Sequence, residues 1–316
     1  MPYCMISQCP DYRVDRVRQH LQQHLEKIPH LSQQIKTGDR ILLKPNLIAP
    51  KGLDQPAQTH PKIILEMARL FKDYGAKPIV GDSPAWGSAQ QCGQALGLLE
   101  PLKQLNVPLI TFKRGTFRRL GHPPRPVYMS LDALEADAII NLPKFKSHQQ
   151  LTATLAVKNM FGCVVGKQKP YWHYAQGKSL LQFGHFLIDI CQAIHPTFTL
   201  IDAVVAMQGP GPINGWPYPM GLLISSTDPM LCERACIDLL KEPPTLFPVY
   251  NAIRERNLLC NTIDNIEWPD LRPDMLSFPD FQFPKPIPLR FSLSRVIKSM
   301  LTGILIRLTK QTKTST

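Results

Sequence analysis

Short apolar segments rich in β-branched residues alternate along the chain with segments whose apolar residues recur at helical spacing. The strand-like segments cover residues 41–43, 79–80, 109–112, 138–142, 200–205 and 222–224. Helical spacing occurs over residues 14–25, 63–71, 186–194 and 231–240. Strands that alternate with helices are usually joined by right-handed crossovers. The pattern predicts an α/β fold with a mostly parallel sheet flanked by helices.

Proline and glycine mark the segments between these elements. Residues 115–128 contain three prolines, so we expect a surface excursion that is neither a helix nor a central strand. Residues 209–219 form a second predicted loop. The following segment, up to Pro288, is proline-rich and irregular. We therefore expect three parts, which are an α/β ligand-binding domain (1–240), an irregular wrapping segment (241–288) and a basic amphipathic tail (289–316).

The tail is predicted to form a C-terminal amphipathic helix. Its apolar stripe follows helical spacing and comprises Leu293, Val296, Ile297, Met300, Leu301, Ile304, Leu305 and Leu308. The other face carries Arg295, Lys298 and Arg307, a composition typical of a helix lying in an anionic membrane surface. Packing on the body of the protein or on a second subunit would also bury such a stripe.

The formal net charge of +12 is distributed unevenly. No acidic residue follows Asp280, whereas seven basic residues do, so the body of the chain is only mildly basic. We find no zinc finger, recognition-helix motif or aromatic stacking signature, which argues against nucleic acid as a partner.

The N-terminal residues contain no secretory signal, and no uninterrupted apolar run approaches the length of a membrane-spanning helix. We expect a cytoplasmic protein that is peripheral to a membrane if its tail binds lipid. Eight cysteines are scattered without a C-x-x-C pair, so we expect mostly free thiols. Cys232 and Cys236 have the spacing of two metal ligands on one helix, but two small buried residues fit as well. Cys163 is expected to be a buried, inert thiol.

Polar residues fall at or near the carboxyl ends of four predicted strands. Carboxyl ends of parallel strands line the crevice in which open α/β sheets bind ligands, so these residues are expected to converge. They are Lys44 and Asn46, then Asp82 and Ser83, then Asn141 and Lys144, and finally Asp202. Turn-forming residues are common at strand ends in any α/β protein, which is the alternative explanation.

The lysines favour the functional explanation. Ammonium groups of Lys44, Lys144, Lys146 and Lys158 would repel one another unless an anion, or carboxylates such as Asp82 and Asp202, neutralised them. We therefore expect a Lys/His-rich cleft that binds a small anionic metabolite bearing phosphate or carboxylate.

Three further residues are candidates for catalysis, namely His148, His185 and Asp202. Either histidine could move a proton or bind a divalent metal ion, and His185 precedes Asp189 by one helical turn. Each could instead be a structural histidine. Lys167, which follows a glycine, could also bind the ligand. Gly209 and Gly211 lie in a loop whose prolines lack amide donors, so a rigid wall is more plausible there than a phosphate loop.

Together these motifs resemble the family called domain of unknown function 362. The similarity covers roughly residues 35–240 in the order 43–47, 81–84, 136–148, 154–162 and 202–212, and it adds Asn159 to the candidate ligand-binding residues. Many relatives carry a fused ferredoxin-like module with C-x-x-C-x-x-C runs. This chain has only Cys260 after Cys236, so the resemblance implies that an iron-sulfur role would need a separate ferredoxin-like partner.

Three functions remain open from the sequence. The first is an anion-binding protein or enzyme of undefined reaction, and the second is a redox or metal-handling accessory protein. The third is a non-catalytic module that binds a membrane surface through its tail.

Overall fold

The computed structural model describes residues 2–27, 31–166, 168–176, 179–259 and 263–285. Its strands are β1 (Met5–Gln8), β2 (Arg40–Pro45), β3 (Lys77–Asp82), β4 (Leu109–Thr111), β5 (Gly115–Leu120), β6 (Arg125–Ser130), β7 (Ala138–Leu142), β8 (Lys144–His148), β9 (Thr152–Thr154), β10 (Phe198–Gln208), β11 (Trp216–Tyr218) and β12 (Leu222–Ser226). Its α-helices are α1 (Val14–Lys27), α2 (Leu31–Gln34), α3 (Pro61–Asp73), α4 (Ala89–Ala95), α5 (Leu99–Gln104), α6 (Leu131–Leu134), α7 (Ala156–Asn159), α8 (Gln168–Gln176), α9 (Leu180–Ile194), α10 (Pro229–Leu240) and α11 (Pro248–Glu255).

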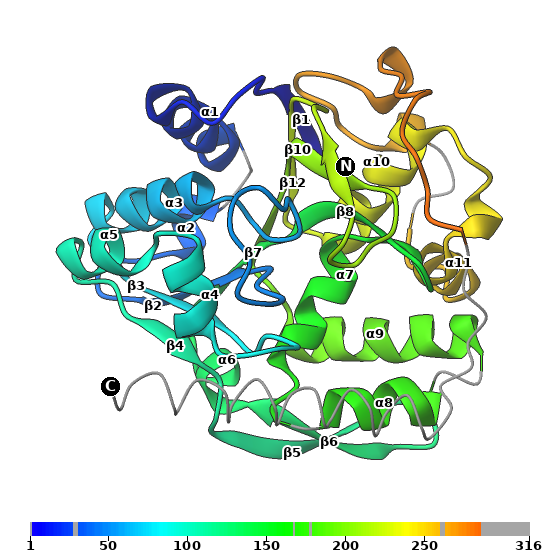
Figure 1. Cartoon of the computed structure of the whole chain (residues 1–316), viewed down its shortest axis with the longest axis horizontal. Helices are drawn as coiled ribbons and strands as arrows, with labels where there is room; N and C mark the ends of the chain where they lie inside the picture. The colour runs from blue at the N-terminus through cyan, green and yellow to red at the C-terminus, as the bar shows by residue number, and fades with distance from the viewer. Residues whose placement is uncertain (1, 28–30, 167, 177–178, 260–262, 286–316) are drawn as a thin grey trace.

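The predicted sheet is present and is mostly parallel (Figure 1). Neighbouring strands follow the order β1-β12-β10-β7-β2-β3-β4. The five strands from β10 to β4 pair in parallel, whereas β12 is antiparallel to both of its neighbours. The six predicted strand segments all fall in this sheet, so the expected fold class is confirmed.

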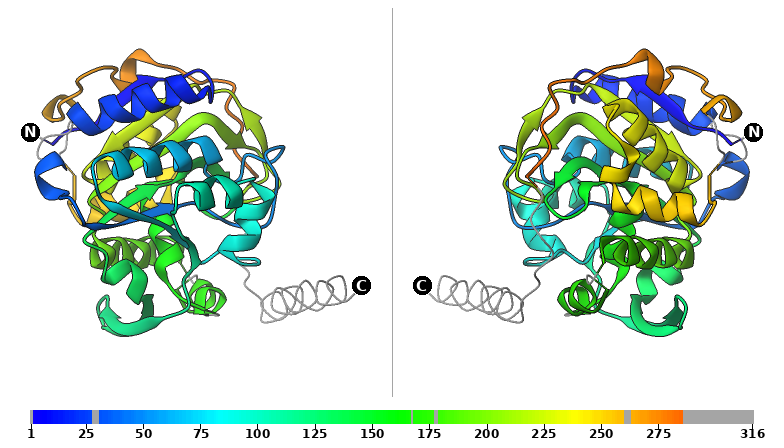
Figure 2. Two further views of the ribbon diagram at one scale, coloured as in Figure 1. Left: turned by 90° about the vertical axis from the view of Figure 1, so that its left-hand side faces the viewer. Right: turned by 90° about the vertical axis from the view of Figure 1, so that its right-hand side faces the viewer.

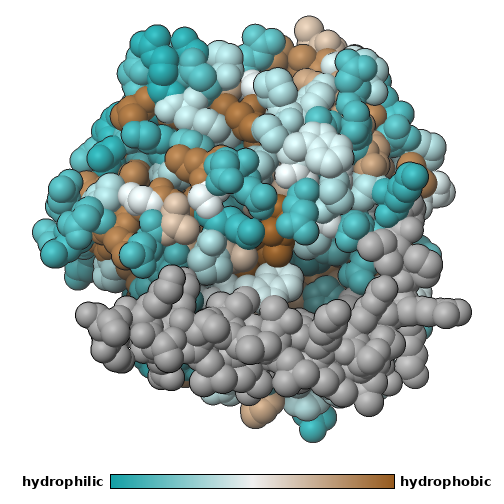
Figure 3. Space-filling view, viewed as in Figure 1, coloured by the Kyte–Doolittle hydropathy of each residue, from teal (hydrophilic) through white to brown (hydrophobic). Residues whose placement is uncertain are grey.

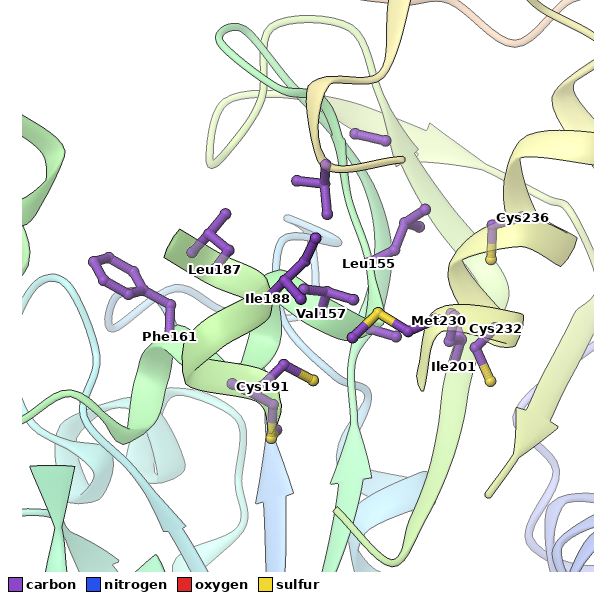
Figure 4. Packing of buried hydrophobic residues seen from close by; sticks show 14 of the residues in the cluster. Leu155, Val157, Phe161, Leu187, Ile188, Cys191, Ile201, Met230, Cys232 and Cys236 are labelled. Atoms are coloured by element: carbon purple, nitrogen blue, oxygen red, sulfur yellow. The ribbon is translucent and has the colours of Figure 1, made fainter. Parts of the chain in front are cut away.

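Helices cover both faces of the sheet and form two hydrophobic cores (Figure 2). On β2, Ile41 and Leu43 belong to the core that contains α1 and α3, whereas Leu42 belongs to the core that contains α9 and α10. This alternation is the period of two that a strand imposes on its side chains. Figure 4 shows the second core, where Leu187 and Ile188 of α9 and Val157 of α7 lie on the same side of the sheet as Met230 of α10.

A small extension of the sheet was missed by the apolar pattern. Strand β10 continues beyond its partner β7 and pairs in parallel with β8, which in turn pairs antiparallel with β9. All five residues of β8 are buried although four of them, Lys144, Lys146, Ser147 and His148, are polar. A buried strand that carries lysines has no apolar signature, which explains why its sequence did not predict it.

Both predicted loops contain short strands. The excursion at 115–128 lies outside the main sheet, as expected, but it forms an antiparallel pair of β5 and β6. Pro126 is tolerated because each strand of a two-stranded sheet is an edge. The loop at 209–219 includes β11, which pairs with β10. The helices α4, α5 and α8 were also not predicted.

The segment expected to wrap irregularly contains helix α11, which packs on α9. The two helices approach closely at Gly184, where a β-carbon would lie 2.7 Å from the carbonyl oxygen of Pro248 and 3.0 Å from Cβ of Ala252. The amphipathic tail at 289–316 lies outside the described residues.

The face of the molecule in Figure 3 carries hydrophilic side chains over much of its described surface, with hydrophobic residues scattered among them. Within the described residues, none of the helices combines the length and the apolar character that crossing a membrane requires.

Substituting Gly184 with alanine tests the α9–α11 contact. Helix propensity alone would stabilise the alanine variant by up to about 1 kcal/mol. The methyl group would instead collide with the backbone of α11, so we expect Gly184→Ala to lower the free energy of unfolding by roughly 1–3 kcal/mol in denaturant titrations. Gln182→Ala, on the exposed side of α9, is the matched control and should change it by less than about 0.5 kcal/mol. A stabilised Gly184→Ala protein would contradict the close packing.

Candidate functional site

The polar residues predicted to converge lie around the point where the strand order reverses. From β2 the chain continues to β3 on one side, and it later returns to β7 on the other side. Lys44 pairs with Asn141 in the register between β2 and β7, so both lie at the same carboxyl edge of the sheet. Open α/β sheets bind ligands at such an edge.

A buried ion pair joins β2 to β3. The ammonium of Lys44 lies 2.9 Å from Oδ1 of Asp82, and both side chains are at most 2% exposed. Lys44 also donates to the carbonyl of Pro45 (2.7 Å) and to Oδ1 of Asn159 (3.3 Å). A β-carbon on Gly162 would lie 2.3–2.6 Å from this pair, so only glycine lets the backbone pass here. The pair is therefore enclosed by protein and has a structural role.

A second buried ion pair joins β8 to β10. The ammonium of Lys144 lies 2.9 Å from Oδ2 of Asp202 and donates to the hydroxyl of Tyr12, also at 2.9 Å. That hydroxyl donates to Oδ1 of Asp202 (2.7 Å), and the ring of Tyr12 stacks on His60 at 3.5 Å between centroids. Burial lowers the pKa of Lys144, while Asp202 acts in the opposite direction. Asp202 is thereby satisfied on both oxygens and holds the N-terminal segment against the sheet.

Three asparagines connect the strands. Asn159 donates through Nδ2 to Oδ1 of Asn141 (2.8 Å) and to the carbonyl of Lys44 (3.1 Å). Its Oδ1 accepts from Nδ2 of Asn46 at 3.1 Å. Asn141 donates in turn to Ala156, the first residue of α7. Each amide therefore has partners in the protein, and the network fixes the position of α7.

Lys146 is buried without a carboxylate. Its ammonium donates to Oδ1 of Asn46 (2.6 Å) and to the carbonyl of Ala57 (2.8 Å), and the carbonyl of Pro212 lies 3.5 Å away. Burial lowers its pKa well below the ordinary value, and the charge of Lys158 adds to this effect. Three oxygen atoms match the three donor positions of a lysine ammonium, so the protein offers Lys146 hydrogen-bond acceptors but no carboxylate among the described residues.

Lys158, at the end of α7, is the least satisfied of these cations. Among the described residues its ammonium makes no hydrogen bond or ion pair, and its contact is the ring of Phe161, 5.7 Å from the ammonium. Burial and the charge of Lys169 lower its pKa to about 8. Lys169 of α8 donates to the carbonyl of Ser83, and burial lowers its pKa to about 8 as well.

His148 adds a hydrogen-bond donor beside these lysines. Its Nδ1 accepts from the backbone N–H groups of Gln150 (3.1 Å) and Leu151 (3.2 Å), so a neutral ring carries its proton on Nε2. Burial lowers the pKa of His148 well below the ordinary value, and the charges of Lys158, His173 and Lys146 act in the same direction. We call Lys44, Lys144, Lys146, Lys158, Lys169, His148 and His173 the lysine site.

The lysine site, for which the sequence predicted a Lys/His-rich cleft, is deeply buried at three of its lysines and partly exposed at two others. Lys44, Lys144 and Lys146 are each at most 2% exposed, whereas Lys158 and Lys169 are partly exposed. Thr154 lies opposite Lys146 across the β8–β9 pair, and its buried hydroxyl has no hydrogen-bond partner among the described residues. A buried hydroxyl without a protein partner is usually satisfied by water or by a ligand.

The predicted glycines form a wall of the lysine site. A β-carbon on Gly211 would lie 1.9 Å from the carbonyl oxygen of Ser147 on β8, and the carbonyl of Gly209 accepts from the hydroxyl of Ser147 at 2.8 Å. The loop therefore lies directly on β8, where Pro212 reaches Lys146. Glycine at position 211 permits this close approach, which agrees with the wall predicted from the sequence.

One candidate residue, His185, lies outside the lysine site. His185 of α9 contacts Glu255 through Nε2 (3.0 Å) and accepts from Arg256 through Nδ1 (2.9 Å). Arg256 also pairs with Asp189 at 2.7 Å, so His185 and Asp189 do share a helix face but bind α11 and its C-terminal flank. Lys167 lies outside the described residues.

Sequence reasoning missed Tyr12, Thr154, Gly162, Lys169 and His173. Glycine in the 154–162 motif was a usable signal, because a motif glycine often marks a close backbone approach. The others lie in segments with no strand-end context, and their proximity depends on tertiary packing. Tyr12 is separated from Asp202 by 190 residues.

The cysteines lie in the cores rather than in the lysine site. The seven described cysteines are free and buried, and burial raises the pKa of Cys163 to about 12, so its thiol stays protonated. Figure 4 shows Cys191, Cys232 and Cys236 among the apolar side chains. The described part of the chain contains no cluster of three or more His, Cys, Asp or Glu residues suited to a metal ion.

Comparison with known proteins gives one family and two similar chains. The model of the family described as Domain of unknown function (DUF362) matches residues 41–238. The Thylakoid-associated protein sll1697 of Synechocystis sp. (strain ATCC 27184 / PCC 6803 / Kazusa) is 36% identical over 288 residues, which are 91% of this chain and 89% of that protein. The lactate racemase apoprotein from Thermoanaerobacterium thermosaccharolyticum aligns with a TM-score of 0.46 and 12% identity over 74% of this chain, which spans 57% of that structure.

A buried carboxyl group accepts hydrogen bonds at the start of α7. Glu233 of α10 is 3% exposed and accepts from the backbone N–H of Val157 at 3.2 Å. Burial raises its pKa from 4.5 to about 7, although hydrogen bonds from Val157 and Ala156 oppose the shift. The folded protein therefore binds more protons than the unfolded chain between about pH 4.5 and 7, and stability falls as the pH rises through this window.

Substituting Glu233 with glutamine should remove this pH dependence. We expect the stability of Glu233→Gln, relative to the natural protein, to increase by about 3 kcal/mol between about pH 4 and 8 in chemical unfolding. Glu26→Gln, an exposed position on α1, serves as the control and should show no such trend. Parallel pH profiles of Glu233→Gln and the natural protein would refute a raised pKa at this position.

Proposed function

Because the chain belongs to the family described as Domain of unknown function (DUF362), whose description assigns no activity, we propose a function from the chemistry of its lysine site. The site binds a small anion that carries phosphate or carboxylate groups. One observation supports this proposal most directly. The ammonium of Lys158 lies beside other lysines and has no hydrogen-bond acceptor among the described residues.

Charge balance supports this proposal. Five lysines gather around the carboxyl ends of the strands, and the two carboxylates among them, Asp82 and Asp202, are each paired with one lysine. Lys146, Lys158 and Lys169 have no carboxylate partner among the described residues, and each lowers the pKa of a neighbouring group. Lysines in such surroundings are stabilised by an anion, because it removes their mutual repulsion.

Each group has a distinct role in binding. Lys158 contacts the anion directly, and the Nε2–H of His148 donates a hydrogen bond to it. Lys169 approaches from α8, whereas Lys146 already donates to Asn46 and Ala57 and is not proposed to contact the anion. Fixed donors and charges of this kind stabilise negative charge on a ligand or in a transition state. In an enzyme, the lysine site would supply this stabilisation of negative charge.

We also propose that the protein associates peripherally with a membrane. The relative that is 36% identical over nearly its full length is described as thylakoid-associated. Seven basic residues after Asp280 without an acidic residue give this chain a local charge that anionic lipids attract.

Replacing Lys158 with methionine separates binding from stability. Sulfate is a suitable probe because its charge is constant over the relevant pH range. We expect Lys158→Met to weaken sulfate binding about tenfold or more in isothermal titration calorimetry, since a charged hydrogen bond is lost. The free energy of unfolding should rise by roughly 1–2 kcal/mol, because burial disfavours the ammonium. Lys103→Met, at an exposed position, should change neither quantity, and unchanged sulfate affinity in Lys158→Met would refute the proposed contact.

The lowered pKa values predict how sulfate affinity depends on pH. Lys158 and Lys169 have pKa values of about 8, and the anion binds their charged forms. Affinity should therefore be constant at lower pH and should fall as the pH rises through about 8, because deprotonation competes with binding. Calorimetric titrations across this range test the point. Affinity that declines only near the ordinary lysine pKa of 10.5 would show that these ammonium groups are not the ones that bind.

A further inference from the structure

The antiparallel pair of β5 and β6 projects from the body of the protein. Figures 1 and 2 show it at the end of the molecule farthest from α1. Its strands pair with each other and not with the main sheet, and helix α8 lies next to it, since Gln168 accepts from the backbone N–H of Tyr128. We call residues 113–130 the hairpin.

The hairpin is strongly basic and unneutralised. It contains Lys113, Arg114, Arg118, Arg119 and Arg125 and has no acidic residue. Arg114 lies 3.8 Å from Glu135. The side chains of the other four make no ion pair or hydrogen bond anywhere in the described part of the chain. These four cations therefore form no ion pair that could contribute to the stability of the fold, which leaves them available to a partner.

Exposed aromatic rings accompany these charges. Phe117 on β5 is 64% exposed and Tyr171 on α8 is 56% exposed. Together with Pro126 and Trp172 they line a hollow of about 390 Å³ between the hairpin and α8, with Arg125 at its edge. Large exposed aromatic residues gathered beside unpaired arginines indicate a surface that meets a partner.

The chemistry of this surface fits an anionic lipid layer. Aromatic rings enter the boundary between headgroups and acyl chains, while arginines remain at the level of the phosphates. Nucleic acid also combines phosphate with stacking, but it needs accessible ring faces. Here Phe117 lies tilted against Tyr128 and Tyr171 packs edge to face on Trp172, both at 5.0 Å between centroids. Insertion into lipid does not require a ring face to be free for stacking, so the arrangement of these rings favours lipid.

The chain's own tail is a poor occupant of the same surface. Residues 281–316 carry seven basic residues and no acidic one, so the hairpin would repel them. The hairpin and the tail are both positively charged, so both can bind the same anionic surface.

We propose that the hairpin, with Phe117 and Tyr171, is a docking surface for anionic membranes. The inference rests on the peripheral membrane association proposed above and names the residues that mediate it. Helix α8 connects this surface to the lysine site, because it carries both Tyr171, which lines the hollow, and Lys169 of the lysine site. Docking therefore places the lysine site close to the lipid surface.

Vesicle binding of the full-length protein tests the proposal. Flotation would use vesicles of equimolar phosphatidylcholine and phosphatidylglycerol, compared with phosphatidylcholine alone. We expect the double variant Arg118→Gln/Arg119→Gln to bind the anionic vesicles about 30-fold more weakly. Phe117→Ser should weaken binding about tenfold. The matched control, Lys77→Gln/Lys103→Gln, removes two exposed lysines outside the hairpin and should bind like the natural protein. Thermal unfolding midpoints of all variants should agree, since the altered side chains are exposed.

The outcomes distinguish the two proposals. If the natural protein binds anionic vesicles but the hairpin variants bind equally well, the hairpin is not the docking surface while the peripheral association stands. If the natural protein does not bind anionic vesicles at all, both proposals fail. If the hairpin variants keep vesicle binding but lose affinity for single-stranded RNA in a parallel titration, the surface recognises nucleic acid and the lipid proposal is overturned.

Discussion

A lysine side chain buried at the carboxyl end of a parallel strand is unfavourable unless its ammonium finds oxygen acceptors. This requirement organises the centre of the protein. Lys44 and Lys144 obtain carboxylates from neighbouring strands, and Lys146 obtains three oxygen atoms. The acceptors come from β2, β3, β10 and the loops that follow them. The sheet, the asparagine network and the glycine loop are thus held in one arrangement by the need to solvate buried charge.

The lysines consequently divide into two groups with different roles. Lys44 and Lys144 are structural, because removing either would leave a buried carboxylate without a partner. Lys158 and Lys169 have no carboxylate partner among the described residues, and burial lowers the pKa of each to about 8. Retaining destabilising groups is typical of functional sites, where part of the stability is given up for binding.

The sequence predicted the sheet and the strand-end residues because both follow from local patterns. Short apolar segments rich in β-branched residues identified the parallel strands, and polar residues at their ends identified Lys44, Asp82 and Asn141. The sequence could not predict β8, since a buried strand with lysines has a polar sequence. It also could not predict the contact between Tyr12 and Asp202, since these residues are far apart in the chain. The sequence also did not predict that Lys44, Lys144 and Lys146 are almost completely buried, because residue identity does not reveal burial.

The central claim is that the unpaired cations of the lysine site hold an anion. The most direct measurement is a crystal structure of the protein soaked in tungstate, a phosphate analogue whose metal is located by anomalous scattering. The account predicts a tungstate ion within hydrogen-bonding distance of Nζ of Lys158 and Nε2 of His148. Tungstate bound only at other surfaces of the protein, with none at Lys158, would contradict it.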